Sequence, residues 1–524
     1  MVGGRGTLGK ATAQKRSRKN AHCDQLMKEG IHDAPIHVAV TRTMTLTELA
    51  IELERKDCLS CALEWHAALE RRGVADELAV YHDVSWANAI AGERYGTRWQ
   101  WEQPTLAREI FLLRRAISNQ KFGAFPDIER CQILNNVGNR LRVAGRYLDA
   151  LAYWDRVLQI QPNFGMALCN RSMILAAYAK TLADANDLAL FLWVAHKEAS
   201  AALAPTALYT HARDAQTIKQ VRERKNWIES VVDVRGIAGL DPLSRPDSSA
   251  TEEERDYRSW SLTQRLFLDP ANDLGPYAVA ATDSLLLPTH VVPVASPHTL
   301  DELFDQMKQE YVSARWMLYE GVSTKTPHFS DRKVRLHATE AKAALSLAIE
   351  KVKAAYRISY SLFDKIGFFL NAYMGLGIPE RKVSFRRLWR PDEKKPIRQE
   401  FDQTGNWGFC ALYWLAKDFF EKEHDEVAEP EARSLSDIRN HLEHKYLRVT
   451  VGDHQTRSSD DLALTVFRKE FEAKALHLLS LARVALIYLA TGVGFEERRR
   501  EPERANIPIQ ELPMPSFLED TEKL

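Results

Sequence analysis

Apolar residues recur at helical spacing along two long stretches of the chain, about 44–235 and 299–491. In the first stretch they form short helix pairs, and in the second they predict an up-and-down bundle of five or so helices. We expect a basic, flexible segment over 1–43, a Pro-rich connector over 236–298 and a charged tail over 492–524. The pattern therefore predicts an all-α protein in which a helical solenoid precedes a helical bundle.

The clearest helix pair runs over 131–164, where small and large residues fall at fixed offsets. Gly138 and Ala150 allow two antiparallel helices to approach closely, Trp154 fills the space between them, and Pro162 ends the second helix. The set comprises Leu134, Val137, Gly138, Leu141, Gly145, Tyr147, Ala150, Trp154, Val157 and Pro162. It resembles a tetratricopeptide (TPR) repeat, and weaker copies on both sides predict three to four repeats.

The resemblance to TPR proteins implies that the repeats stack into a short solenoid. Its concave face is expected to bind a peptide or protein partner. A purely structural stack, or one packed onto the bundle, is the alternative. The connector contains the aromatic stretch YRSWSLTQRLFLDPANDLG, which we expect to pack on the bundle, and continues over 276–298 as a Pro-rich extended segment.

Within the second stretch, helical periodicity and turn signals predict individual helices. They are expected at about 299–320, 333–366, 367–375, 403–422, 434–449 and 460–491.

Composition limits the classes of function. The chain has 524 residues, enough for two to four domains, and Lys+Arg equals Asp+Glu at 71 each. A zero formal net charge argues against a protein that coats nucleic acid, although it permits a local basic cleft. The longest apolar run, 473–492, is interrupted by His477 and Arg483, so we predict a core helix and no membrane span.

The chain contains six scattered cysteines, a usage that fits a reducing cytoplasm, where we expect the protein. Cys58 and Cys61 form a lone C-x-x-C pair with His66 nearby. Since no second pair follows at zinc spacing and the pair falls in a helical pattern, a structural role is favoured over metal binding. We expect no metal and no cofactor.

Candidate chemistry concentrates in the string Arg439-Asn440-His441-Leu442-Glu443-His444, at the start of a predicted helix. Arg439 carries a planar fork of donors that matches a phosphate, and His444 can move protons near neutral pH. Asn440 shares a helix face with His444, whereas Arg439 lies roughly 140° away at about 100° per residue. One helix therefore cannot aim both groups at one point, and they would flank a cleft or meet across a dimer.

The spacing alone is weak evidence, since Arg332 and His337 repeat it. The Asn after Arg439 and the helical context distinguish the later string. The plain alternative is a solvated helix in which Arg439 forms a salt bridge with Glu443, four residues on.

The string R-N-x-x-x-H resembles the signature of the HEPN superfamily, and the flanking LFLDPANDL and SFRRLW stretches resemble its TPR-linked branch. The resemblance implies a metal-independent endoribonuclease in which the 2′-hydroxyl of RNA attacks the adjacent phosphate at a site shared by a homodimer. It also implies roles: His444 as general acid or base, Arg439 as stabiliser of phosphoryl charge, and Asn440 as an orienting group. A toxin or anti-phage effector is the expected biological class.

A basic segment precedes the motif. Eight cations against four anions lie over 380–400, and Phe385 and Trp389 are interleaved with them. These aromatics either stack on bases or anchor the loop to the core, with the anchor slightly favoured. The predicted RNA contacts are Arg386, Arg387, Arg390 and Lys445.

Two functions from different classes remain. The first is a TPR-regulated HEPN ribonuclease, with RNA, a peptide or protein ligand and a second copy of the chain as partners. The second is a non-catalytic adaptor that binds protein partners or RNA.

Overall fold

The computed structural model describes residues 5–94, 100–210, 215–244, 247, 249, 251–291, 298–337, 343–392, 395–402, 404–419, 429–430, 432–451, 462–504, 517–518 and 520–523. In these residues it contains 18 α-helices and one two-stranded sheet, which confirms the all-α prediction.

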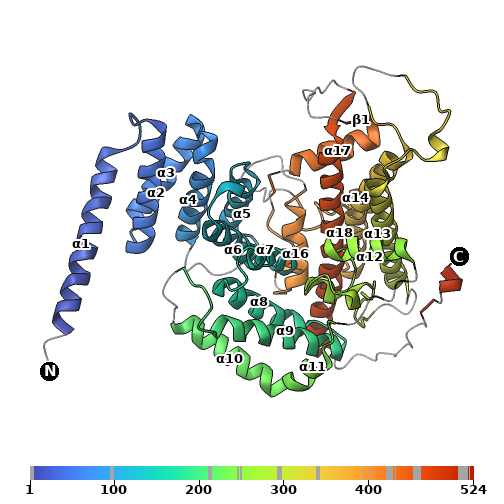
Figure 1. The fold of residues 1–524 in the computed structure, drawn as a ribbon, viewed down its shortest axis with the longest axis horizontal. Coiled ribbons are helices and arrows are strands. Elements are labelled where there is room, and N and C mark those ends of the chain that lie inside the picture. Colours follow the sequence, from blue (N-terminus) through green and yellow to red (C-terminus); the bar gives the residue numbers. More distant parts are fainter. Residues whose placement is uncertain are drawn as a thin grey trace.

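Twelve helices form the N-terminal part and the connector. They are α1 (Arg5–Glu29), α2 (Ile36–Leu53), α3 (Lys56–Arg72), α4 (Asp76–Arg94), α5 (Pro104–Ser118), α6 (Asp127–Val143), α7 (Tyr147–Ile160), α8 (Gly165–Ala179), α9 (Ala185–Leu203), α10 (Ala215–Val231), α11 (Val234–Leu240) and α12 (Glu252–Thr263). Successive helices pack as antiparallel neighbours and form a curved array, blue to green in Figure 1. We call α1–α10 the helical array.

The C-terminal part contains the remaining helices and the sheet. They are α13 (Thr299–Ser323), α14 (Leu347–Tyr373), α15 (Gln399–Asp402), α16 (Trp407–Ala416), α17 (Ala432–His444), β1 (Tyr446–Thr450), β2 (Ala463–Phe467) and α18 (Arg468–Arg500). Helices α13, α14 and α18 pack side by side, and α16 packs along α18 on the side that meets the array (Figure 1). We call this part the bundle.

The packing of α6 on α7 follows the small-to-large pattern of the sequence. Trp154 is fully buried, and a Cβ added at Gly138 would lie 2.8 Å from its Cε2 atom. Only a residue without a side chain fits there, because Trp154 occupies the space. The pair α8 and α9 also packs closely.

The first helix differs from the sequence-based expectation. A flexible segment was predicted over 1–43, but α1 covers Arg5–Glu29 and α2 begins at Ile36. Cys23 is fully buried and Leu26 nearly so, in a small core with α2 and α3. The prediction was wrong because it weighed the charge of the segment and overlooked these apolar positions.

The array and the bundle share one continuous hydrophobic core, which extends from α4 to α18. Polar contacts cross the boundary as well. The Tyr488 hydroxyl of α18 accepts the backbone N–H of Leu148 at 3.1 Å and donates to the Asp149 carboxylate at 2.8 Å. Trp414 of α16 donates its indole N–H to the Trp101 carbonyl at 3.1 Å. The two parts are therefore held together by buried contacts.

The connector packs against this body through its LFLDPANDL stretch. Arg483 of α18 donates to the Asp273 carboxylate at 2.7 Å and to the Phe267 carbonyl at 2.6 Å. Arg315 of α13 binds Asp283 in the same way, with Nη2 2.7 Å from Oδ2. These buried guanidiniums donate to backbone carbonyls of the connector, which lie outside regular helices and strands and so lack backbone partners of that kind.

Several predicted helix boundaries were wrong for local reasons. Helix α14 begins at Leu347, later than the expected 333, because Ser346 and Asp331 cap its first N–H groups. It then continues without a break to Tyr373, although a separate short helix was predicted over 367–375. Helix α16 begins after Asn406, which accepts the Phe409 N–H at 3.1 Å, and so is shorter than 403–422.

The largest correction follows the motif. A helix was predicted through 449, but α17 ends at His444 and Tyr446–Thr450 forms a strand parallel to β2, with Tyr446 opposite Ala463. Val449, Thr450, Thr465 and Val466 are β-branched residues that favour strands. The last helix accordingly begins at Arg468 and extends past 491 to Arg500.

Helix α18 is long and apolar enough to cross a membrane by length and composition alone. However, 83% of its most apolar window is buried within the protein. It is the central helix of the bundle, as its interrupting Arg483 predicted.

Candidate functional site

The motif string occupies the second half of α17. Leu435, Ile438 and Leu442 point into the core, against α14. This i, i+3, i+7 stripe leaves Arg439 half-buried and Asn440 and His444 exposed. The same amphipathic pattern that fixes the helix therefore presents the three predicted catalytic residues toward its outer side.

Arg439 is held by an aromatic ring. Its guanidinium carbon lies 5.4 Å from the ring centroid of Tyr360 on α14, and its Nη1 donates to Asn440 Oδ1 at 3.2 Å. Burial raises the pKa of Tyr360 to about 12, and the Arg439 charge opposes that rise. Asn440 thus orients Arg439, whereas the sequence led us to expect that it orients His444 or a phosphate.

His444 is the last residue of α17 and makes no hydrogen bond with any residue that the structure describes. Its neighbour His441 differs, since Nδ1 lies 2.7 Å from the Asp437 carbonyl and donates to it. Glu443 pairs with Arg357 of α14, with 3.8 Å between Oε1 and Nε. The predicted alternative, a helix salt bridge between Arg439 and Glu443, is not found among the described ion pairs.

The helix end is fixed by a second contact from α14. Arg357 donates from Nη2 to the Leu442 carbonyl at 2.6 Å, and so satisfies one of the last carbonyls of α17. The second R-x-x-x-x-H string, Arg332 to His337, lies in an exposed loop after α13. Only the later string lies on a helix.

The basic segment approaches the motif through Asp364 of α14. The backbone N–H of Phe385 donates to Asp364 Oδ1 at 3.4 Å, and the Arg439 charge acts on the same carboxyl. Burial raises the pKa of Asp364, with Arg439 and the Phe385 N–H opposing. Tyr360 and Asp364 therefore connect the loop to the motif. The sequence gave no sign of them beyond an apolar stripe on a long helix.

The aromatics of the basic segment anchor it. Phe385 and Trp389 are 0% and 1% exposed, so they belong to the core and are not available to bases. Arg390 pairs with Glu102 of the array at 2.8 Å and donates to the Tyr413 hydroxyl at 3.2 Å. Arg386 is half-buried, whereas Arg387 and Lys445 are exposed.

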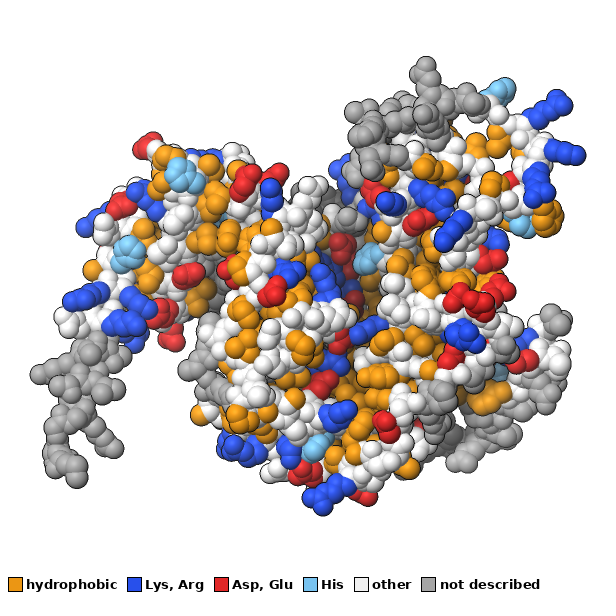
Figure 2. Space-filling view, viewed as in Figure 1, with side chains coloured by type: hydrophobic (Ala, Val, Ile, Leu, Met, Phe, Trp, Pro, Cys, Tyr) orange, Lys and Arg blue, Asp and Glu red, His pale blue; other side chains and the backbone are white. Residues whose placement is uncertain are grey.

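The charges of the whole surface show no single basic face in the view of Figure 2, where Lys and Arg side chains are interspersed with Asp and Glu. This distribution agrees with a formal net charge of zero. Any nucleic-acid contact on this side is therefore confined to small basic areas.

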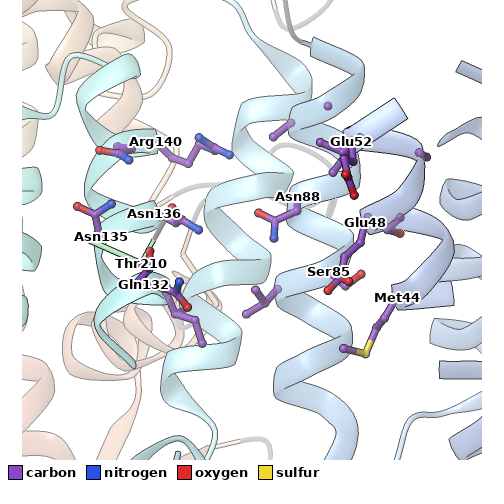
Figure 3. A pocket seen from close by; sticks show the side chains of 18 of the residues that line it. Met44, Glu48, Glu52, Ser85, Asn88, Gln132, Asn135, Asn136, Arg140 and Thr210 are labelled. Atoms are coloured by element: carbon purple, nitrogen blue, oxygen red, sulfur yellow. The ribbon is translucent and has the colours of Figure 1, made fainter. Parts of the chain in front are cut away.

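A second candidate site is a groove of about 1800 Å³ in the helical array. Its walls come from α2 and α4 on one side and α6 on the other, and Tyr209, Thr210, Thr217 and Ile218 also line it. Figure 3 shows Asn88 of α4 between Glu48 and Glu52 on one wall and Gln132, Asn136 and Arg140 on the other. The groove is larger than the roughly 300–1,000 Å³ that is typical of small-molecule sites.

The groove is mixed in charge. Five carboxylates and four cations line it: Glu48, Glu52, Glu54, Glu93, Glu129, Arg55, Lys56, Arg94 and Arg140. A nucleic acid would meet as much repulsion as attraction there. The amide side chains of Asn88, Gln132 and Asn136 can each donate and accept, as a peptide backbone requires.

The C-x-x-C pair is structural. Cys58 is fully buried, and burial raises the pKa of its thiol to about 12. In the described residues, one group has metal-ligating atoms close together, namely Glu70, His82 and Asp83. Arg115 binds both of its carboxylates, with Nη1 2.7 Å from Glu70 and Nε 2.8 Å from Asp83. These carboxylates are already neutralised by a cation.

Comparison with known proteins identifies the C-terminal part. No curated protein and no solved structure matches the chain. Residues 292–496 match the model of the LA2681-like HEPN family. The match contains α13 to α18, and thus both the basic segment and the string from Arg439 to His444. The bundle, with its motif helix, is therefore similar to a HEPN domain.

Proposed function

We propose that the protein is a metal-independent endoribonuclease whose site is formed by α17 of two copies, under the control of a peptide or protein partner in the groove. The observation that carries this proposal is the placing of Arg439 and His444 on the outer side of a helix within the HEPN match. HEPN domains are commonly ribonucleases, which supports the reaction class at the level of the family.

The chemistry needs a proton acceptor, a proton donor and a cation. The 2′-oxygen of RNA loses its proton and bonds to phosphorus, the bond from phosphorus to the 5′-oxygen breaks, and that oxygen is protonated. The products carry a 2′,3′-cyclic phosphate and a 5′-hydroxyl. His444 would move the protons, and Arg439 would stabilise the extra charge on the phosphoryl oxygens.

Two copies are part of the proposal because one helix presents Arg439 and His444 in different directions. Large apolar side chains are exposed at this end of the bundle. Val334 and Leu336 lie on the loop after α13, and Val451 and Leu462 flank the sheet. The backbone of the segment that follows this loop pairs with β1, since the Ala344 N–H donates to the Val449 carbonyl at 2.7 Å. Gathered apolar side chains of this kind suit contact with a second copy.

The experiment compares cleavage by the full chain and its variants in EDTA. Arg439→Ala and His444→Ala should lose the 2′,3′-cyclic phosphate product, each by at least about 100-fold. His337→Ala is the matched control, because His337 ends a string of identical spacing that lies in a loop. Cleavage by the wild type that survives both substitutions in α17 would refute the site. Binding of RNA or protein with no cleavage at all would favour the adaptor function.

A further inference from the structure

We propose that α5 of the helical array positions the motif helix through Arg114, and so couples the groove to the candidate catalytic residues. The inference rests on the proposed function for the site that it regulates. Its structural part can be tested without RNA cleavage.

Arg114 contacts one residue just after α16 and one just before α17. Its Nη1 atom lies 3.1 Å from Asp418 Oδ1 and 3.2 Å from Glu429 Oε2. Asp418 follows α16 directly, and Glu429 comes just before α17. One guanidinium from the array therefore fixes where the chain leaves α16 and where it approaches the motif helix.

The contact is deeply buried. Asp418 is 0% exposed and Arg114 only 7%. Arg146, the N-cap residue of α7, pairs with Asp418 as well. Loss of Arg114 would leave Glu429 without this cation and Asp418 with one cation fewer in a medium that screens charge poorly. The approach to α17 is thus tied to the array by a directional contact that water cannot replace.

The other side of α5 binds two arginines that line the groove. Glu109 is fully buried, and it accepts from Nε of Arg94 at 2.7 Å and also pairs with Arg140. Arg94 and Arg140 line the groove from α4 and α6. Glu109 and Arg114 are five residues apart, roughly 140° around the helix, so α5 contacts the groove arginines and the approach to α17 from different faces. A groove ligand that draws Arg140 toward itself removes a counter-charge from Glu109. The ion pair that holds α5 against α6 is then lost, and α5 can shift.

Other contacts place the same element against the bundle. Glu102, just before α5, pairs with Arg390 of the basic segment, and the Trp101 carbonyl accepts from Trp414 of α16. The unit 101–118 therefore contacts α16, the basic segment and the approach to the motif helix. None of the other described helices of the array has contacts of this kind to all three.

The neighbouring arginine supplies a matched control. Arg115 pairs with Glu70 and Asp83, so the described ion pairs of this residue lie within the array. Arg114→Gln and Arg115→Gln remove the same charge from adjacent positions of one helix. Only the first should affect α17.

The test is amide hydrogen exchange in the full chain, with α13 as the internal reference. Arg114→Gln and the milder Glu429→Gln should speed exchange over 432–444 at least tenfold relative to α13, and Arg114→Lys should restore most of the protection. Arg115→Gln should speed exchange in α3 and α4 and leave 432–444 unchanged. Equal exchange over 432–444 in the wild type and Glu429→Gln would overturn the positioning role, even if Arg114→Gln does not fold.

The coupling to the groove has its own variants, Glu109→Gln and Arg140→Gln. Either should speed exchange over 432–444, although the described side-chain partners of both residues lie within the array. A change confined to α4–α6 in both variants would overturn the coupling. If RNA is cleaved, Glu429→Gln should lower kcat more than it raises KM. If no RNA is cleaved, the exchange data still decide the structural claim, so the two proposals fail separately.

Discussion

The guanidinium carbon of Arg439 on α17 lies 5.4 Å from the ring centroid of Tyr360 on α14. Tyr360 is 8% exposed and belongs to the core of the bundle. The cation of the motif is therefore placed by a rigid helix, whereas His444 sits at an exposed helix end. Substitutions in the core of the bundle should therefore change the position of Arg439 more than that of His444.

Tyr360→Phe should retain cleavage, because the ring that faces Arg439 remains. Tyr360→Leu removes the cation–π contact, worth about 0.5–2 kcal/mol, and should lower kcat/KM roughly 2- to 30-fold. Steady-state cleavage of a short RNA measures both variants. Equal activity in Leu and Phe variants would show that the ring does not position Arg439.

Two arginines of the basic segment, Arg387 and Arg390, should behave differently toward RNA. Arg387 is exposed, so Arg387→Ala should weaken RNA binding and lower the slope of log K against log salt by about 0.7. Arg390 pairs with Glu102, so Arg390→Ala should leave that slope unchanged. Fluorescence anisotropy over a salt series measures the slope. An equal loss of slope in the two variants would contradict the prediction that Arg387 contacts RNA and Arg390 does not.

The sequence predicted the helical class and the packing of the clearest repeat because both depend on local spacing. Gly138 and Trp154 are an example. A small residue and a large one at facing positions of two paired helices are expected to contact each other. The sequence also favoured a buried Trp389. Aromatic residues among cations either stack on a ligand or anchor a loop, and the anchor was the favoured alternative.

Other features depend on residues far apart in the chain. Tyr360 and Asp364 meet Arg439 only after α14 packs on α17, so no local pattern marks them. The contact of Arg114 with Asp418 joins positions 304 residues apart. The strand Tyr446–Thr450 is five residues long and follows directly on a helix, where the helical period masked its β-branched residues.

Acid should destabilise the helical array through His66. This imidazole is fully buried between Thr47, Ser85 and Trp86, and burial lowers its pKa well below the ordinary value, with the nearby His82 adding to the effect. The unfolded chain therefore takes up a proton below about pH 6.5 that the folded chain refuses. The stabilisation is present above that pH and is lost as the pH falls.

The measurable result is the slope of the free energy of unfolding against pH. His66→Phe keeps the ring against Trp86, and Thr47 keeps its bond to the Thr43 carbonyl at 2.9 Å. The variant should reduce the slope between pH 6.5 and 5 by up to about 1.4 kcal/mol per pH unit. His32→Phe, at an exposed position, should leave the slope unchanged. A wild-type slope in His66→Phe would contradict the role of His66.

Mixed dimers test whether the site is shared between copies. A dimer of Arg439→Ala and His444→Ala chains keeps one intact Arg439 and one intact His444, contributed by different copies. If the site draws the two groups from opposite copies, mixing the two inactive proteins should restore cleavage, up to about half of the mixed population by random exchange of subunits. Titration of one variant against the other should give a maximum of cleavage near equal amounts.

The double variant Arg439→Ala/His444→Ala mixed with either single variant is the matched control, because such dimers lack one of the two groups entirely. Restoration by the double variant would point to contamination, and no restoration in stable mixed dimers would mean that each copy uses its own Arg439 and His444.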